Sequence, residues 1–113
     1  MITPKIINCG ESGTTARVSM LPVAFGAAGE GIFVFTGEGS LPTRPFKNLV
    51  DMINAKATAS LIKTGNCESF AVPANSEYHM PIKIYVGNGA IRELVQEINE
   101  GRYEYFRHAL VAA

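Results

Sequence analysis

The run from Cys9 to Arg17 holds residue types that bind anions: a thiol, two glycines, three hydroxyl side chains and an arginine. A phosphate loop built on a cysteine and an arginine would need the two residues closer together than they stand here. Residues 14–25 form a β-prone segment, so no helix is expected to direct its N-terminus at an anion. A P-loop is excluded because no lysine stands between Lys5 and Lys47. We therefore interpret the run as a glycine-rich hairpin.

Three short Gly-x-Gly elements, at 29–31, 37–39 and 87–89, could belong to nucleotide-binding loops. None of them continues to a third glycine at the spacing that such loops require. The element Gly37-Glu38-Gly39 has the best context, because it follows an apolar strand and precedes a helix. The carboxylate of Glu38, however, would repel a pyrophosphate. Turns explain all three elements, and no nucleotide cofactor is predicted.

Glu77 and His79 lie two positions apart on a predicted strand, so their side chains project from one face and could share a metal ion. His108 is the only other histidine, and no further ligand stands nearby at metal-binding spacing. A nucleophile triad is not expected either, because Asp51 is the only aspartate and falls on the solvated side of a helix. No Gly-x-Ser-x-Gly elbow is present. The sequence therefore predicts no metal, no cofactor and no catalytic residue, and the protein is not expected to be an enzyme.

The composition is that of one globular domain, residues 1–113, with 47% hydrophobic and 18% charged residues. Ten basic residues balance ten acidic ones, which argues against binding nucleic acid through its phosphates. No apolar run is long enough to cross a membrane, and the first residues lack the order of a secretory signal. We expect synthesis in the cytoplasm. Whether Cys9 and Cys67 form a disulfide is left open by the sequence.

The pattern of apolar residues predicts an α+β fold, mainly an antiparallel sheet or sandwich with one mid-chain helix and one C-terminal helix. Strands are expected at 2–7, 14–25 and 32–35, and the last of these is apolar on both faces, as in a central strand. The mid-chain helix has Thr43 as its cap and Pro45 in its first turn. Its buried face repeats at helical spacing and consists of Phe46, Leu49, Val50 and Ile53.

The second half of the chain predicts a hairpin, a strand and a helix. Strands at 58–64 and 67–72 flank the turn Gly65-Asn66. The strand over 78–86 alternates cleanly, with Met80, Ile82, Ile84 and Val86 on one face. An apolar helical stripe then runs from Ile91 to Ala109, and Gly101 inside it favours a kink or a break.

The end of this stripe combines aromatic and arginine side chains, which are the residue types that anchor protein interfaces. Nearby glutamates cancel the charge that nucleic-acid binding would need. We therefore predict that the chain forms a homo-oligomer, and contacts other protein subunits, through Arg102, Tyr103, Tyr105 and Phe106.

The segment from Phe70 to Lys83, FAVPANSEYHMPIK, resembles a pattern in small virion proteins of phages and gene-transfer agents, of the decoration and spike-base type. In those proteins a Phe-x-Val-Pro-Ala-Gly turn leads into a strand, and Asn75 here replaces the glycine. The resemblance implies a non-enzymatic structural subunit of a virion, such as a capsid-decorating or tail-associated protein. The alternative is a small α+β enzyme or ligand-binding module, with its pocket near Gly37–Gly39 or beside Glu77 and His79.

Overall fold

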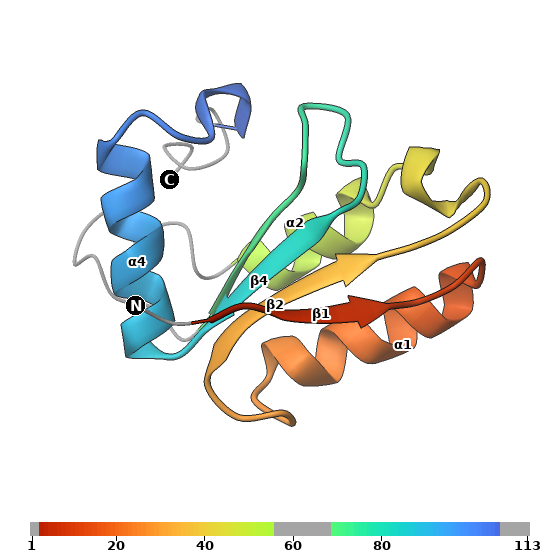
Figure 1. Cartoon of the computed structure of the whole chain (residues 1–113), viewed down its shortest axis with the longest axis horizontal. Coiled ribbons are helices and arrows are strands. Elements are labelled where there is room, and N and C mark those ends of the chain that lie inside the picture. Colours follow the sequence, from red (N-terminus) through yellow and green to blue (C-terminus); the bar gives the residue numbers. More distant parts are fainter. Residues whose placement is uncertain (1–2, 56–68, 107–113) are drawn as a thin grey trace.

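The computed structural model describes residues 3–55 and 69–106, and these form an α+β fold, as predicted (Figure 1). Along the chain the elements are β1 (Lys5–Asn8), α1 (Gly13–Ala24), β2 (Gly31–Thr36), a 3₁₀ turn η1 (Leu41–Thr43), α2 (Lys47–Asn54), β3 (Ser69–Val72), β4 (Ile82–Val86), α4 (Asn88–Asn99) and a 3₁₀ turn η2 (Glu104–Phe106).

The strands form one mixed sheet in the order β1-β2-β4-β3. β1 and β2 are parallel, so the chain crosses over through α1 between them, while β4 runs antiparallel to both β2 and β3. The prediction that residues 32–35 form a central strand is confirmed, because β2 lies between β1 and β4 and buries Phe33 and Phe35.

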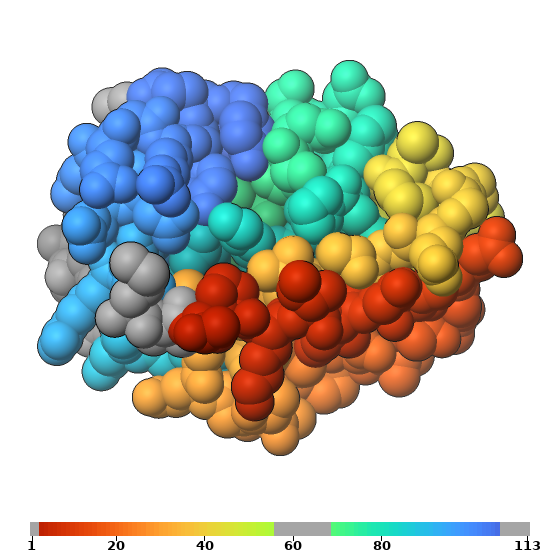
Figure 2. Space-filling model, viewed as in Figure 1, coloured from red at the N-terminus to blue at the C-terminus, as the bar shows by residue number. Residues whose placement is uncertain are grey.

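Helices cover both faces of this sheet. Three apolar residues of β4 point to one face of the sheet: Ile82, Ile84 and Val86. On this face α1 packs against β4, and α2 packs against β3 (Figure 1). Lys83 and Tyr85 point to the other face, where α4 packs. In Figure 2 the blue residues of α4 and of the chain after it lie beside the green and teal residues. Each face therefore presents its own set of side chains.

The prediction of a strand over 14–25 is wrong, because these residues form α1. Ala16, Met20 and Val23 recur at helical spacing and are buried, whereas Val18, expected on the same face as Ala16 and Met20, is 65% exposed. The helical period is obscured in the sequence because apolar residues are exposed as well, Val18 on the outward side of α1 and Phe25, which is 79% exposed, directly after it.

Both predicted helices are confirmed, with shorter bounds. α2 begins at Lys47 and buries the predicted apolar face, while Thr43 lies in the preceding turn and donates to the Ser40 carbonyl instead of capping the helix. α4 ends at Asn99, and Gly101 adopts a left-handed φ of +88°. The Arg102 N–H then donates to the Glu97 carbonyl at 3.0 Å, which reverses the chain as in a Schellman motif.

Several predictions fall on residues outside the described ranges. The first strand of the hairpin and its Gly65-Asn66 turn lie there, and the second strand appears as β3. Cys9 is a buried free thiol whose pKa is raised by burial, while Cys67 lies outside the described residues. Within the described ranges, no helix has the length and apolar character required to cross a membrane.

Candidate anion-binding site

The loops that follow β1 and β2 lie side by side at one end of the sheet (Figure 1). Both strands are parallel, so their carboxyl ends meet at the same edge, which is where α/β sheets usually bind ligands. Two hydrogen bonds join the loops: the Cys9 N–H donates to the Thr36 carbonyl at 2.8 Å, and the Glu38 N–H donates to the Gly10 carbonyl at 2.7 Å. This end of the sheet carries the candidate site.

The N-terminus of α1 lies at this end of the sheet, directly after the loop that follows β1. Ser12 is the N-cap, and its Oγ accepts the Thr15 N–H at 3.1 Å. No residue in the described ranges accepts the N–H groups of Gly13 or Thr14. The first turn of α1 also contains no acidic side chain. The helix therefore presents two unused N–H donors, together with the positive end of its dipole, to an anion.

Two arginines lie beside these donors. A Cβ built on Gly13 would stand 3.4 Å from an Nη1 atom of Arg17 and 3.4 Å from an Nη1 atom of Arg44, so the two guanidinium groups flank one point. The Arg17 guanidinium also lies 5.9 Å from the centre of the Phe46 ring, which supports it from one side. Among the residues that the structure describes, neither arginine has an acidic partner.

This arrangement is suited to holding an oxyanion. Guanidinium groups bind phosphate and carboxylate oxygens through paired N–H donors, and an anion between Arg17 and Arg44 would also relieve the repulsion between their charges. Gly13 is buried, and the absence of a side chain there lets Arg17, Arg44 and Leu41 approach the backbone of the first turn of α1. The chemistry that follows from the geometry is binding and orientation of an anionic group.

The sequence interpretation of the run from Cys9 to Arg17 as a simple hairpin is therefore wrong. A strand over 14–25 would leave no helix N-terminus here, whereas the structure has α1 beginning at Gly13. A usable signal was present, since Ser12 stands as an N-cap before small and apolar residues at helical spacing. Nothing in the sequence connects Arg44 to this run. Gly37 and Gly39, near which the alternative pocket was predicted, do lie beside the site: Leu41 packs over Gly37, and the Glu11 side chain lies against Gly39.

Glu77 and His79 lie in the loop before β4 and not on a strand, because β4 begins at Ile82. His79 Nε2 is 3.6 Å from Glu77 Oε2, and the Asn75 side chain accepts the N–H groups of both residues. These contacts order the loop. His108, the third candidate for a shared metal, lies outside the described residues.

The residues predicted to form an interface have different surroundings. Phe106 is fully buried and packs edge-on against Phe70 and Tyr78, with ring centres 6.4 and 5.5 Å apart. Tyr103 is half-buried, while Arg102 and Tyr105 are exposed. The Tyr105 hydroxyl donates to the Pro73 carbonyl at 2.7 Å. Contact of these residues with another copy or another protein stays a prediction.

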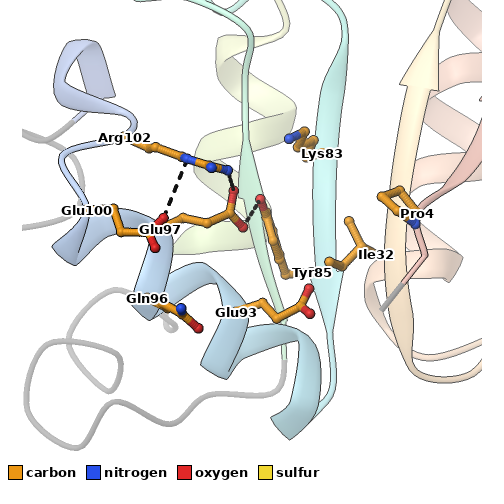
Figure 3. A pocket seen from close by; sticks show the side chains of 9 residues that line it. All are labelled: Pro4, Ile32, Lys83, Tyr85, Glu93, Gln96, Glu97, Glu100 and Arg102. Atoms are coloured by element: carbon orange, nitrogen blue, oxygen red, sulfur yellow. Dashed lines mark hydrogen bonds and ion pairs between the residues drawn. The ribbon is translucent and has the colours of Figure 1, made fainter. Parts of the chain in front are cut away.

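A network of hydroxyl groups joins α4 to β4. The Glu97 carboxylate accepts from Tyr85 at 3.1 Å, from Tyr103 at 2.8 Å and from Arg102 at 3.2 Å (Figure 3, where Tyr103 is not drawn). The Tyr85 and Tyr103 hydroxyl oxygens are 2.6 Å apart. Burial raises the pKa of both tyrosines, that of Tyr103 to about 12; the Tyr103–Glu97 hydrogen bond adds to this rise, and the bond to Tyr85 opposes it.

Alkaline pH is expected to destabilise the protein through Tyr103. In the unfolded chain this hydroxyl ionises near pH 10, whereas the folded protein keeps its proton until about pH 12. Between these values the unfolded state binds fewer protons, so the free energy of unfolding falls as the pH rises. Urea unfolding from about pH 8 to pH 11 measures this slope. Tyr103→Phe should show a smaller fall, and an equal fall in both proteins would contradict the assignment.

The chain is similar to curated enzymes over about half of its length. It is 46% identical over 54 residues to the 3-phosphoshikimate 1-carboxyvinyltransferase of Pyrococcus abyssi, covering 48% of this chain and 12% of that enzyme. The enzymes of the same name from Helicobacter acinonychis and Natronomonas pharaonis are 37% identical over 62 residues and 47% identical over 53 residues. These matches cover 55% and 46% of this chain, and 14% and 11% of the respective enzymes. No family model matches the chain, and no solved structure gives a significant match.

These similarities correct the function expected from the sequence. The resemblance of Phe70–Lys83 to virion proteins is misleading, because every relative named above is an enzyme and none is a phage structural protein. The segment is a short turn and strand, which unrelated folds share. The expectation of a non-enzymatic virion subunit is therefore wrong, and the alternative of an α+β enzyme or ligand-binding module fits better. The matched segments amount to 11–14% of the length of these relatives, so this chain is similar to one part of a carboxyvinyltransferase.

Proposed function

We propose that this chain binds an anionic group of a substrate in a carboxyvinyl transfer reaction, at the N-terminus of α1 between Arg17 and Arg44. The observation that carries the proposal is the convergence of both guanidinium groups at Gly13, in the first turn of α1. The similarity to 3-phosphoshikimate 1-carboxyvinyltransferases supports the reaction class.

The substrates in the name of these relatives carry the groups that this site would recognise. A 3-phosphoshikimate bears a phosphate, and a carboxyvinyl group bears a carboxylate. Both are oxyanions that can accept paired N–H donors from an arginine and further donors from a helix N-terminus. Arg17, Arg44 and the N–H groups of Gly13 and Thr14 would therefore hold and orient one such group. Fixed orientation lowers the entropy cost of bringing two reactants together.

Calorimetric titration tests this proposal, with inorganic phosphate, acetate and 3-phosphoshikimate as the three ligands. We expect saturable binding that weakens as salt is added, because the arginines are exposed and their charges are screened. The phosphate and acetate arms show which oxyanion the site prefers. Absence of binding by all three ligands at low salt would contradict the proposal.

Gly13→Ala is expected to separate anion binding from stability. The new methyl group would contact both guanidinium groups at the first turn of α1 and should weaken anion binding about tenfold, the loss of roughly one charge-assisted hydrogen bond. Because Gly13 is helical and its φ is not left-handed, alanine should leave the fold intact and raise stability by up to about 1 kcal/mol. Calorimetric titration and thermal unfolding measure the two effects.

The matched control for this variant is Ser19→Ala. It also raises the helix propensity of α1, but it lies farther along the helix and adds nothing between the arginines. Its anion affinity should equal that of the parent protein. If Gly13→Ala binds anions as tightly as Ser19→Ala, the space at Gly13 is not the binding site.

A further inference from the structure

Phe46 is connected to both arginines of the anion site. Its ring centre lies 5.9 Å from the Arg17 guanidinium carbon, and Arg44 precedes it by two positions, with Pro45 between them. Arg44 has the extended backbone, with ψ at 136°, that a following proline favours. Phe46 is buried, so its own position is fixed by packing. The position of Phe46 therefore affects both guanidinium groups.

The backbone of Phe46 is held by the loop between β3 and β4, which lies beside the start of α2 (Figure 1). The Phe46 N–H donates to the Tyr78 carbonyl at 2.8 Å, and the Phe46 carbonyl accepts the Val50 N–H at 2.9 Å, where α2 begins. Phe46 is the N-cap of α2, yet its side chain makes no capping hydrogen bond. The bond to Tyr78 therefore ties the start of α2 to a distant part of the chain.

Tyr78 presents this carbonyl from an unfavourable backbone conformation. Its φ is +64°, in the left-handed region, which is costly for a residue with a large side chain. The turn around it is closed by Asn75, whose carbonyl accepts the Tyr78 N–H at 3.1 Å. The Asn75 side chain also accepts the N–H groups of Glu77 and His79. These donors bond within the turn, whereas the Tyr78 carbonyl bonds outside it, to Phe46.

The side chain of Tyr78 anchors the turn to the core. The residue is buried, and its ring packs edge-on against Phe106, with ring centres 5.5 Å apart. The ammonium of Lys47, the first residue of α2, lies 5.4 Å from the centre of the Tyr78 ring. A change of φ at Tyr78 would have to break these contacts. Backbone strain that is held in this way is typical of functional sites.

We propose that Tyr78 is a positioning residue for the anion site. It does not touch the anion: its carbonyl holds Phe46, and the Phe46 ring holds the Arg17 guanidinium in the position for binding. A site that is ordered beforehand loses less conformational entropy when its ligand binds. The inference rests on the proposed function for the role of Arg17 in binding, but the position of Arg17 can be measured with no anion present.

The Arg17 Nε–H resonance reports that position, because the ring current of Phe46 shifts it. In the protein without anion, Phe46→Leu should remove this shift, whereas Phe33→Leu, the same change in another buried ring, should keep it. Calorimetry should show about two- to fivefold weaker phosphate binding in Phe46→Leu, the effect of a cation–π contact at an exposed site. Phe33→Leu should bind phosphate as the parent protein does.

Tyr78→Gly and Tyr78→Ala test the backbone conformation, because both remove the ring and only glycine adopts a left-handed φ readily. Tyr78→Gly should keep the Arg17 resonance of the parent protein and most of its phosphate affinity. Tyr78→Ala should shift the resonance toward that of Phe46→Leu and bind phosphate about fivefold or more weaker than Tyr78→Gly. Tyr78→Phe, which keeps the ring, should match the parent protein in both measurements.

A milder variant serves if loss of the Tyr78 ring unfolds the protein, which thermal unfolding shows. Asn75→Ala keeps that ring and removes the acceptor of the Glu77 and His79 N–H groups. It should shift the Arg17 resonance in the same direction as Tyr78→Ala. Ser76→Ala, in the same exposed turn, is its matched control and should leave the resonance unchanged.

The outcomes separate this inference from the proposed function. The inference is overturned if the Arg17 resonance of Phe46→Leu equals that of the parent protein, or if the folded Tyr78→Ala and Tyr78→Gly agree in both measurements. It is also overturned if Asn75→Ala, used in their place, leaves the resonance unchanged. If the resonance responds as expected but no protein binds phosphate, the positioning of Arg17 is supported and the proposed function is contradicted.

Discussion

Replacing Arg17 and Arg44 together by glutamine is expected to lower the affinity for inorganic phosphate and for 3-phosphoshikimate by about a hundredfold or more. Each arginine can make charge-assisted hydrogen bonds with one anion, and losing one such bond costs about 1.5–3 kcal/mol, or about tenfold or more in affinity. Glutamine keeps a side chain of similar shape at each position while removing the charge. Calorimetry at low salt measures the change.

The single variants and a control show whether both arginines act on the same ligand. Each single glutamine variant should lose part of the affinity, and the two losses need not add, because the groups flank one point. Arg92→Gln removes a cation from the exposed side of α4 and should bind anions as the parent protein does. If the Arg92 variant loses as much affinity as the double variant, the effect is one of net charge and the site is not at α1.

Much of the fold could be predicted from the sequence where one face of an element is apolar and the other polar. In α2, Leu49, Val50 and Ile53 alternate with polar residues at helical spacing, and the structure buries these three residues. β4 shows the alternation of a strand. The break of the C-terminal helix at Gly101 was also predictable, because glycine is the residue that most readily adopts a left-handed φ after a helix.

α1 could not be predicted in the same way, because polar and apolar residues are mixed on its outward side. Val18 and Phe25 are exposed in the described structure, so they obscure the helical period of the buried Ala16, Met20 and Val23, and the β-branched residues of α1 suggest a strand. The consequence was larger than one misassigned element. Without α1 there is no helix N-terminus at Gly13, and the run from Cys9 to Arg17 loses its chemical meaning.

The candidate site and the network between α4 and β4 also depend on contacts between residues far apart in the chain. Arg44 reaches Gly13 because the loops after β1 and β2 are held together at the ends of two parallel strands. Lys83 and Tyr103 meet because the chain reverses after α4 and returns toward β4. Such long-range contacts depend on the order of the strands and on where the helices end. No local pattern of residue types specifies them.

Asn54→Leu is expected to lower the free energy of unfolding by about 2–5 kcal/mol. Asn54 is the buried polar residue at the end of α2, and its side chain satisfies both backbone groups of Ala71 in β3. Its Nδ2 donates to the Ala71 carbonyl at 2.7 Å, and its Oδ1 accepts the Ala71 N–H at 2.8 Å. Leucine fills a similar volume but leaves two buried backbone groups without these partners, each costing about 1–3 kcal/mol.

Urea unfolding of this variant, compared with Asn48→Leu, tests that assignment. Asn48 lies on the exposed side of the same helix, so its replacement makes the same chemical change without removing a buried hydrogen bond, and its effect should stay within about 0.5 kcal/mol. A large loss in Asn54→Leu alone means that the side-chain amide joins α2 to β3. Equal losses in both variants would mean that the added apolar side chain, and not the contact with Ala71, determines the change.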